Sequence, residues 1–186
     1  MKLSLAWAVL GLTLLCSAQA APLDLDAKDF WQTPAIAGYG QMHPFPEGVY
    51  QPAKDQVYKL LFVVEEASDK PGDLNHGLEA VARAYNLFVS AGVPADHLKF
   101  VVVISGGALP AVLDEAHYKA QLGVANPNLE LIHKLRGAGV DLVACAQAAL
   151  HKKYQPDWIN PDVHLALSAL TTRAVLQAQG YSEIQL

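Results

Sequence analysis

Residues 57–64, with the sequence VYKLLFVV, form an apolar run that only Lys59 interrupts. The run is rich in β-branched and aromatic residues, which is typical of a strand buried on both faces of a parallel sheet. Two later segments have a similar apolar, β-branched composition: LKFVVVI at residues 98–104 and VDLVAC at residues 140–145. These three segments predict the centre of a sheet.

Helical patterns fill the intervals between these runs. Apolar side chains recur at helical spacing over residues 74–91, and Gly92 follows them as a helix-ending glycine. Residues 108–128 predict two short helical pieces. A further helix is expected over residues 127–135, with Asn126 as its N-cap.

The C-terminal part continues the alternation. It predicts a short helix at residues 146–153, a helix at residues 171–179 and a final strand at residues 181–186. Residues 163–167 fit either a fourth strand or the first turn of the last helix. Strands that alternate with helices at this spacing form a parallel sheet covered on both sides. Residues 57–186 therefore predict one three-layer α/β/α domain with a mostly parallel sheet of about five strands.

Residues 21–56 differ from the rest of the chain because they combine prolines, glycines and aromatic residues without helical or strand periodicity. Such a segment predicts an extended arm, laid over the domain or over a neighbouring subunit. Its apolar side chains, among them Phe30, Trp31 and Tyr50, argue against disorder.

The first twenty residues have the pattern of a secretory signal peptide. Lys2 precedes an apolar run, and Ala18-Gln19-Ala20 places small residues where a signal peptidase cleaves. The run is short for a membrane span, so no span is expected once residues 1–20 are removed. We therefore predict an exported protein, with the periplasm as the expected location.

Composition argues against several classes of ligand. The formal net charge is −5 and no run of Lys or Arg occurs, which argues against nucleic acid as a partner. The seven histidines show none of the common metal-binding spacings, so neither a metal nor another cofactor is predicted. A metal held by Cys145 with His43, His76 or His151 is kept as a third alternative.

Loss of the signal peptide leaves Cys145 as the one cysteine, so no internal disulfide is predicted. Cys145 ends a predicted strand immediately before a helix, a setting that favours the thiolate. A small buried core residue fits the same position. The other strand ends carry Glu65-Glu66, whose side chains point to opposite faces, and Ser105-Gly106-Gly107, which predicts a tight turn.

The segment GVDLVACAQ at residues 139–147 resembles the cysteine region of the DsrE/DsrF-like family. The helix at residues 128–135, the strand and turn at residues 101–107 and LQAQGY at residues 176–181 add to the resemblance. It extends from about residue 57 to the C-terminus and implies a three-layer fold assembled into trimers or hexamers. In sulfur-relay members of this family the matching cysteine carries a persulfide, and only Cys145 matches it here.

Two functions are therefore considered. In the first, Cys145 accepts sulfur from a donor protein or a small sulfur compound and passes it to an acceptor, with His76 as a neighbouring base or hydrogen-bond partner. In the second, the protein is a non-catalytic oligomeric binding module and Cys145 is part of its core. An open cleft at Cys145 would favour the first function, and burial would favour the second. The sequence leaves open whether there is catalytic turnover.

Overall fold

The computed structural model describes residues 23–186, so the predicted signal peptide at residues 1–20 lies outside the described residues. The chain divides into two units, one ending at Phe30 and the other spanning Trp31–Leu186. All the helices and strands named below belong to the second unit. Over residues 23–186, no helix combines the length and the apolar character that a membrane crossing requires.

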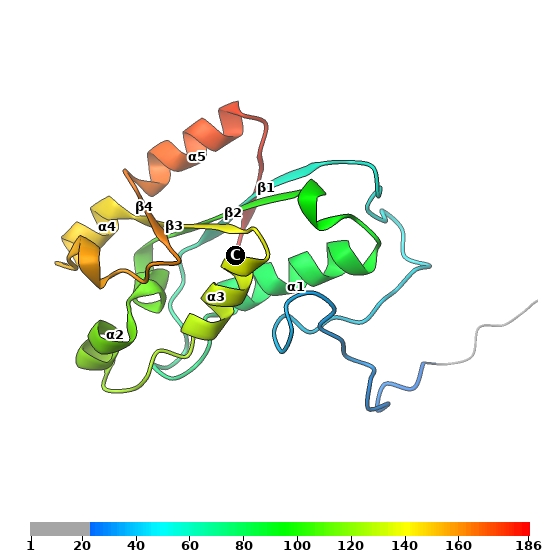
Figure 1. Ribbon diagram of the computed structural model, residues 1–186, viewed down its shortest axis with the longest axis horizontal. Helices are drawn as coiled ribbons and strands as arrows, with labels where there is room; N and C mark the ends of the chain where they lie inside the picture. Colours follow the sequence, from blue (N-terminus) through cyan, green and yellow to red (C-terminus); the bar gives the residue numbers. More distant parts are fainter. Residues whose placement is uncertain (1–22) are drawn as a thin grey trace, which may run out of the picture. The chain divides into compact units, whose positions relative to one another are not determined.

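A five-stranded sheet forms the centre of the second unit (Figure 1). Its strands lie in the order β4-β3-β2-β1-β5, and every neighbouring pair is parallel. The strands are β1 Tyr58–Val64, β2 Leu98–Ile104, β3 Asp141–Cys145, β4 His164–Ala166 and β5 Ser182–Gln185. The prediction of a mostly parallel sheet of about five strands is confirmed, and residues 163–167 contain a strand.

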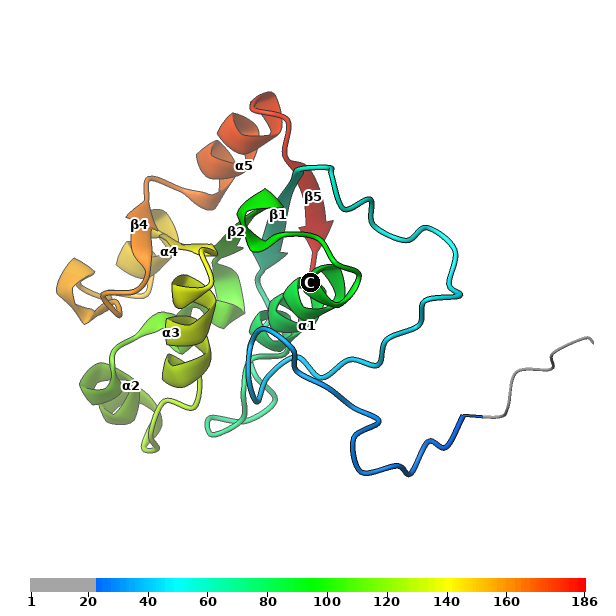
Figure 2. The ribbon, with the colours of Figure 1, turned by 45° about the vertical axis from the view of Figure 1, so that its right-hand side comes forward.

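Helices cover both sides of the sheet. Figures 1 and 2 show α1 and α3 on one side and α5 on the other. The α-helices are α1 His76–Ser90, α2 Glu115–Leu122, α3 Leu129–Gly137, α4 Ala146–His151 and α5 Ala169–Ala178. Short 3-10 helices occur at Ala95–His97, Gly106–Val112 and Pro156–Trp158. The predicted three-layer α/β/α architecture is confirmed.

The two faces of the sheet are buried in separate cores of unequal size. The larger core contains side chains from alternate strand positions and from the helices on the α1 side, including Phe62, Phe100 and Leu78. The smaller core consists of Leu61, Val63, Val101, Val103 and Val143. Ala169 and Leu176 of α5 pack against this smaller core, although none of residues Ala169–Ala178 is itself buried. The face that carries the smaller core therefore has the thinner cover.

Part of the predicted arm is held against α1 by one side chain. The buried Asn86 amide accepts hydrogen bonds from the backbone N–H groups of Ala35 and Ile36, at 2.9 and 2.8 Å. The same amide donates to the carbonyl oxygens of Tyr39 and Gly40. This segment of the arm thus lies over its own domain.

The expected N-cap of α3 is wrong. Asn128, not Asn126, immediately precedes the helix. The buried Asn126 amide donates to the carbonyl oxygens of Ala111 and Leu113, at 3.0 and 2.8 Å. It is therefore used to fix the loop before α3 rather than to cap the helix.

Candidate functional site

Cys145 is the last residue of β3 and the N-cap of α4. Its Sγ accepts hydrogen bonds from the backbone N–H of Ala148 at 3.4 Å and of Ala169 at 3.3 Å. Ala148 lies in the first turn of α4, and Ala169 is the first residue of α5. Two N–H donors, from the first turn of α4 and the first residue of α5, therefore point at one sulfur.

The short edge strand β4 brings α5 to this sulfur. In the parallel register Cys145 pairs with Ala166, so the chain leaves the sheet beside the cysteine. The Ser168 hydroxyl then accepts a hydrogen bond from Thr171 N–H at 3.0 Å and caps α5. With the start of α5 beside its sulfur, Cys145 is only 6% exposed, so the residue is buried rather than open to solvent.

Glu65, Ser105 and Cys145 follow one another across the carboxyl edge of the sheet. The register pairs Val64 with Ile104, and Ile104 with Ala144, so the next position along these three strands holds Glu65, Ser105 and Cys145. A hydrogen bond from Ser105 N–H to the Val64 carbonyl at 3.0 Å extends the ladder to this position.

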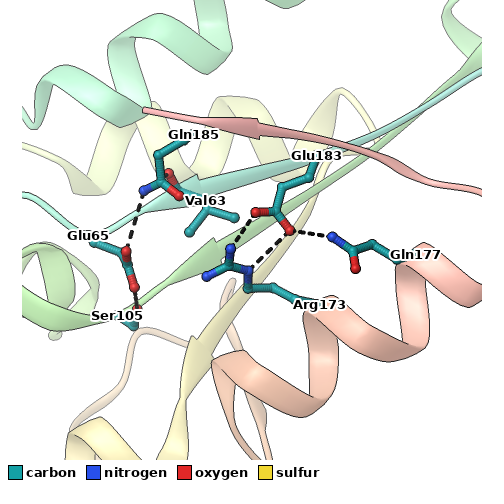
Figure 3. Close-up of polar contacts among 7 residues, drawn as sticks. All are labelled: Val63, Glu65, Ser105, Arg173, Gln177, Glu183 and Gln185. Atoms are coloured by element: carbon teal, nitrogen blue, oxygen red, sulfur yellow. Dashed lines mark hydrogen bonds and ion pairs between the residues drawn. The ribbon is translucent and has the colours of Figure 1, made fainter.

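The three side chains also share one face of the sheet. Val63, Val103 and Val143, each two residues earlier, all belong to the smaller core. The Ser105 hydroxyl donates to Glu65 Oε1 at 3.0 Å, as Figure 3 shows. A carboxylate, a hydroxyl and a thiol thus lie in a row on the side that α5 covers.

Glu65 belongs to a wider polar group at this edge (Figure 3). Gln185 Nε2 lies 3.4 Å from Glu65 Oε2, and Arg173 of α5 pairs with Glu183 of β5. The hydrogen bond to the Glu183 carboxylate, with smaller contributions from the charges of Glu183 and Glu65, holds the pKa of Arg173 above its usual value despite desolvation. The positive charge of Arg173 is therefore kept beside these carboxylates.

The turn at Ser105-Gly106-Gly107 needs its glycines for steric reasons. Gly106 has φ +55°, a left-handed conformation that favours glycine. A Cβ on Gly107 would lie 2.9 Å from the backbone nitrogen of Ala67. The predicted tight turn is confirmed, and its close approach to the segment after β1 accounts for both glycines.

His76 lies at the start of α1, where its ring is largely exposed and its Nε2 is 3.1 Å from Asp69 Oδ2. Within residues 23–186, no hydrogen bond joins His76 to Cys145. His76 as a partner of Cys145 therefore stays a prediction. In the same part of the chain no three His, Cys, Asp or Glu side chains gather as metal ligands.

A model of the DsrE/DsrF-like family matches residues 58–186. The chain belongs to the DsrE/DsrF-like family. Among solved structures, a protein of unknown function from Methanobacterium thermoautotrophicum resembles this DsrE/DsrF-like chain with a TM-score of 0.53 and 17% identity. The match covers 69% of this chain and 99% of that one, and at this identity it supports the fold alone. The search of curated proteins gave no match.

Proposed function

We propose that this member of the DsrE/DsrF-like family is an exported thiol-handling protein that carries sulfur on Cys145. The observation that carries the proposal is the pair of backbone N–H groups, from Ala148 and Ala169, that donate to Sγ. Only a thiolate attacks sulfane sulfur efficiently, and these two backbone N–H groups stand within hydrogen-bond distance of the sulfur that would carry its charge.

The chemistry requires nothing beyond the thiolate and a sulfur donor. The Cys145 thiolate attacks the outer sulfur of a persulfide or of thiosulfate, and a new S–S bond forms. The S–S bond of the donor breaks, and its electron pair leaves on a thiolate or on sulfite. Cys145 then holds a persulfide that an acceptor thiol takes by the same exchange. Sulfur carriage of this kind uses no metal or organic cofactor.

Export is the second part of the proposal, and it rests on the signal-peptide pattern of residues 1–20. Cleavage after Ala20 removes Cys16 and leaves Cys145 as the one thiol of the chain. A single thiol in an oxidising compartment has no internal disulfide partner.

Intact mass spectrometry of the mature protein, after incubation with polysulfide or thiosulfate, tests the proposal. We expect a reducible gain of about 32 Da per added sulfur, seen in the wild type and not in Cys145→Ser. A wild-type mass that stays unchanged after prolonged incubation with both donors would refute sulfur carriage by Cys145.

A second candidate is a non-catalytic oligomeric binding module, and the burial of Cys145 favours it. The surface near the cysteine adds support, because Leu167 and Leu170 are 71% and 78% exposed on either side of the cap of α5. Exposed apolar side chains of this kind are suited to contact another protein. The family resemblance suggests a trimer or hexamer. Light scattering on wild type and Leu170→Ser tests this candidate, which predicts an oligomer that the substitution weakens.

A further inference from the structure

A groove runs along one face of α1, between this helix and the arm. It consists of two adjoining hollows of about 520 and 630 Å³, whose lining residues all lie in the second unit of the chain. Met42 and His43 of the arm and Leu87 of α1 line both hollows, so the two form one continuous groove. Figure 2 shows residues 31–56 passing beside α1 and returning to β1.

One face of α1 forms the floor of the groove. Arg83, Leu87, Ser90 and the C-cap residue Ala91 line it, and side chains at these spacings lie on the same side of a helix. With a rise of about 1.5 Å per residue, the groove extends about 12 Å along the helix. This length suits an acyl chain of medium length.

The walls of the groove are held in place by hydrogen bonds of the arm. Gln32 and Met42 exchange backbone hydrogen bonds of 2.8 and 2.9 Å as an antiparallel bridge. Gln51 Nε2 donates to the carbonyl oxygen of Phe45 at 2.8 Å. The Asn86 amide bonds the backbone of the arm to α1. The groove is therefore formed without a ligand, as most binding sites for small molecules are.

The lining of the groove is largely apolar. Trp31, Phe45 and Leu87 are each exposed over about half of their surface, and Val49 is exposed more fully. Exposed apolar side chains that gather around a hollow mark a surface that binds an apolar group. The prolines of the lining are Pro44, Pro46 and Pro52.

The charged side chains of the groove are basic. Arg83 lines one hollow and Lys54 the other, and no Asp or Glu of the described residues is part of the lining. The whole chain has a formal net charge of −5, so the groove is a basic site in an acidic protein. A ligand that complements it has an apolar body and a negative charge.

Arg83 is better suited than Lys54 to bind the negative group. Arg83 Nε donates to the carbonyl oxygen of Gln41 at 3.1 Å, which orients the guanidinium, and further N–H donors remain on its Nη atoms. A planar guanidinium binds a carboxylate through two parallel hydrogen bonds. Lys54 lies over Gly92, with its Nζ 3.2 Å from the position of a Cβ on that glycine. Its charge is therefore next to the carboxyl end of α1, which favours a cation.

We propose that this groove binds a medium-chain carboxylate, with the carboxylate on Arg83 and the acyl chain over Leu87 toward Phe45. The ion pair fixes one end of the ligand, and apolar contacts hold the rest. An alcohol with the same chain makes the apolar contacts but lacks the ion pair. The site shares no residue with the hydrogen-bond partners of Cys145, so it goes beyond sulfur carriage and does not depend on it.

Isothermal titration calorimetry with octanoate and octanol tests the site. Wild type should bind octanoate at one site per chain and octanol about tenfold more weakly, since octanol lacks the charge-assisted hydrogen bonds. Arg83→Gln should lower the affinity for octanoate by a similar factor and leave the affinity for octanol unchanged, because only the carboxylate uses the guanidinium. Leu87→Ser should weaken the binding of both ligands, because both chains contact this residue.

Lys152→Gln and Leu150→Ser are the matched controls for charge and for apolar surface. Both residues are exposed and lie at the end of α4, away from the groove, so wild-type affinities are expected. Equal affinities of the wild type for octanoate and octanol would overturn the proposal without reference to any variant. A loss of octanoate affinity in Lys54→Gln with none in Arg83→Gln would contradict the role of Arg83. If Arg83→Gln loosens the arm and weakens octanol as well, the comparison of the two ligands on wild type decides.

Absence of saturable octanoate binding at millimolar concentration would refute the site. If light scattering then showed that Leu87→Ser changes the oligomeric mass, the groove would be a contact between two copies of the chain. Cys145→Ser should bind octanoate as the wild type does. Failure of this site and failure of sulfur carriage are therefore distinguishable.

Discussion

Arg173 and Glu183 link α5 to β5 through a bidentate ion pair. Arg173 Nε donates to Glu183 Oε2 at 3.1 Å, and its Nη2 donates to Oε1. Gln177, one turn further along α5, donates to the same carboxylate at 2.8 Å. These polar contacts, together with the packing of Ala169 and Leu176 against the smaller core, hold the helix on the sheet. The first residue of that helix, Ala169, covers the sulfur of Cys145.

Arg173→Gln should loosen α5 without unfolding the domain. Partly exposed ion pairs contribute about 1 kcal/mol or less, so the global free energy of unfolding changes little. Hydrogen exchange of the α5 amides should become faster, and alkylation of Cys145 should accelerate with it. Asp69→Asn, which removes an exposed ion pair with His76, is the control and should change neither rate. Unchanged exchange in α5 would contradict this role of the pair.

Asn86→Ala should release the arm from α1. The substitution leaves the buried N–H of Ile36, the partly buried N–H of Ala35 and two carbonyl oxygens of the arm without their partner. Each buried unsatisfied group costs about 1–3 kcal/mol, so we expect a loss of about 3 kcal/mol or more in denaturant unfolding. Gln51→Ala removes hydrogen bonds within an exposed part of the arm and should cost far less. Equal losses in the two variants would show that Asn86 has no special role.

Two glycines of the arm provide a matched pair with similar backbone conformations. Gly40 has φ +62°, and a Cβ there would lie 2.2 Å from the backbone nitrogen of Arg83. Gly38 has φ +85° and no atom within 4 Å of its Cβ position. Gly38→Ala should therefore cost only the strain of a left-handed residue, about 1 kcal/mol. Gly40→Ala should lower the thermal unfolding midpoint much further, and similar midpoints would mean that the arm does not contact α1 there.

Asp114 should make stability depend on pH in acid. It caps α2, and the hydrogen bond from the backbone N–H of His117, with help from the His117 side chain, holds the pKa of Asp114 below its ordinary value of 3.8. The charged carboxylate therefore stabilises the fold above that value, and this contribution is lost as the pH falls through the lower folded pKa. The stability of wild type relative to Asp114→Asn should shrink below about pH 4 in denaturant titrations. A difference that stays constant from pH 6 to acid would contradict the assignment.

The sheet could be predicted because buried parallel strands have a direct signature in composition. Residues 98–104 were predicted with the bounds that β2 has, and β1 begins one residue after its predicted start. Helix ends were less accurate, since side-chain caps decide them. The helix predicted over residues 171–179 begins at Ala169, because the Ser168 hydroxyl caps it.

The candidate site could be predicted only in part. Cys145 was found from its place between a strand and a helix, whereas the row with Ser105 and Glu65 depends on the strand order β3-β2-β1. That order does not follow from the local pattern of any one strand. The sequence places Glu65 beside Glu66, and the two side chains point to opposite faces of the sheet. The structure shows that Glu65 instead accepts a hydrogen bond from Ser105, which is forty residues away in the sequence.

The two donors to the sulfur of Cys145 are already alanines. An alanine scan therefore passes over both, and most replacements at residues 148 and 169 keep the N–H group that does the bonding. Proline is the exception, since it alone lacks that hydrogen. The two hydrogen bonds to the sulfur thus depend on the course of the main chain. Side chains at residues 148 and 169 other than proline can change without removing either bond.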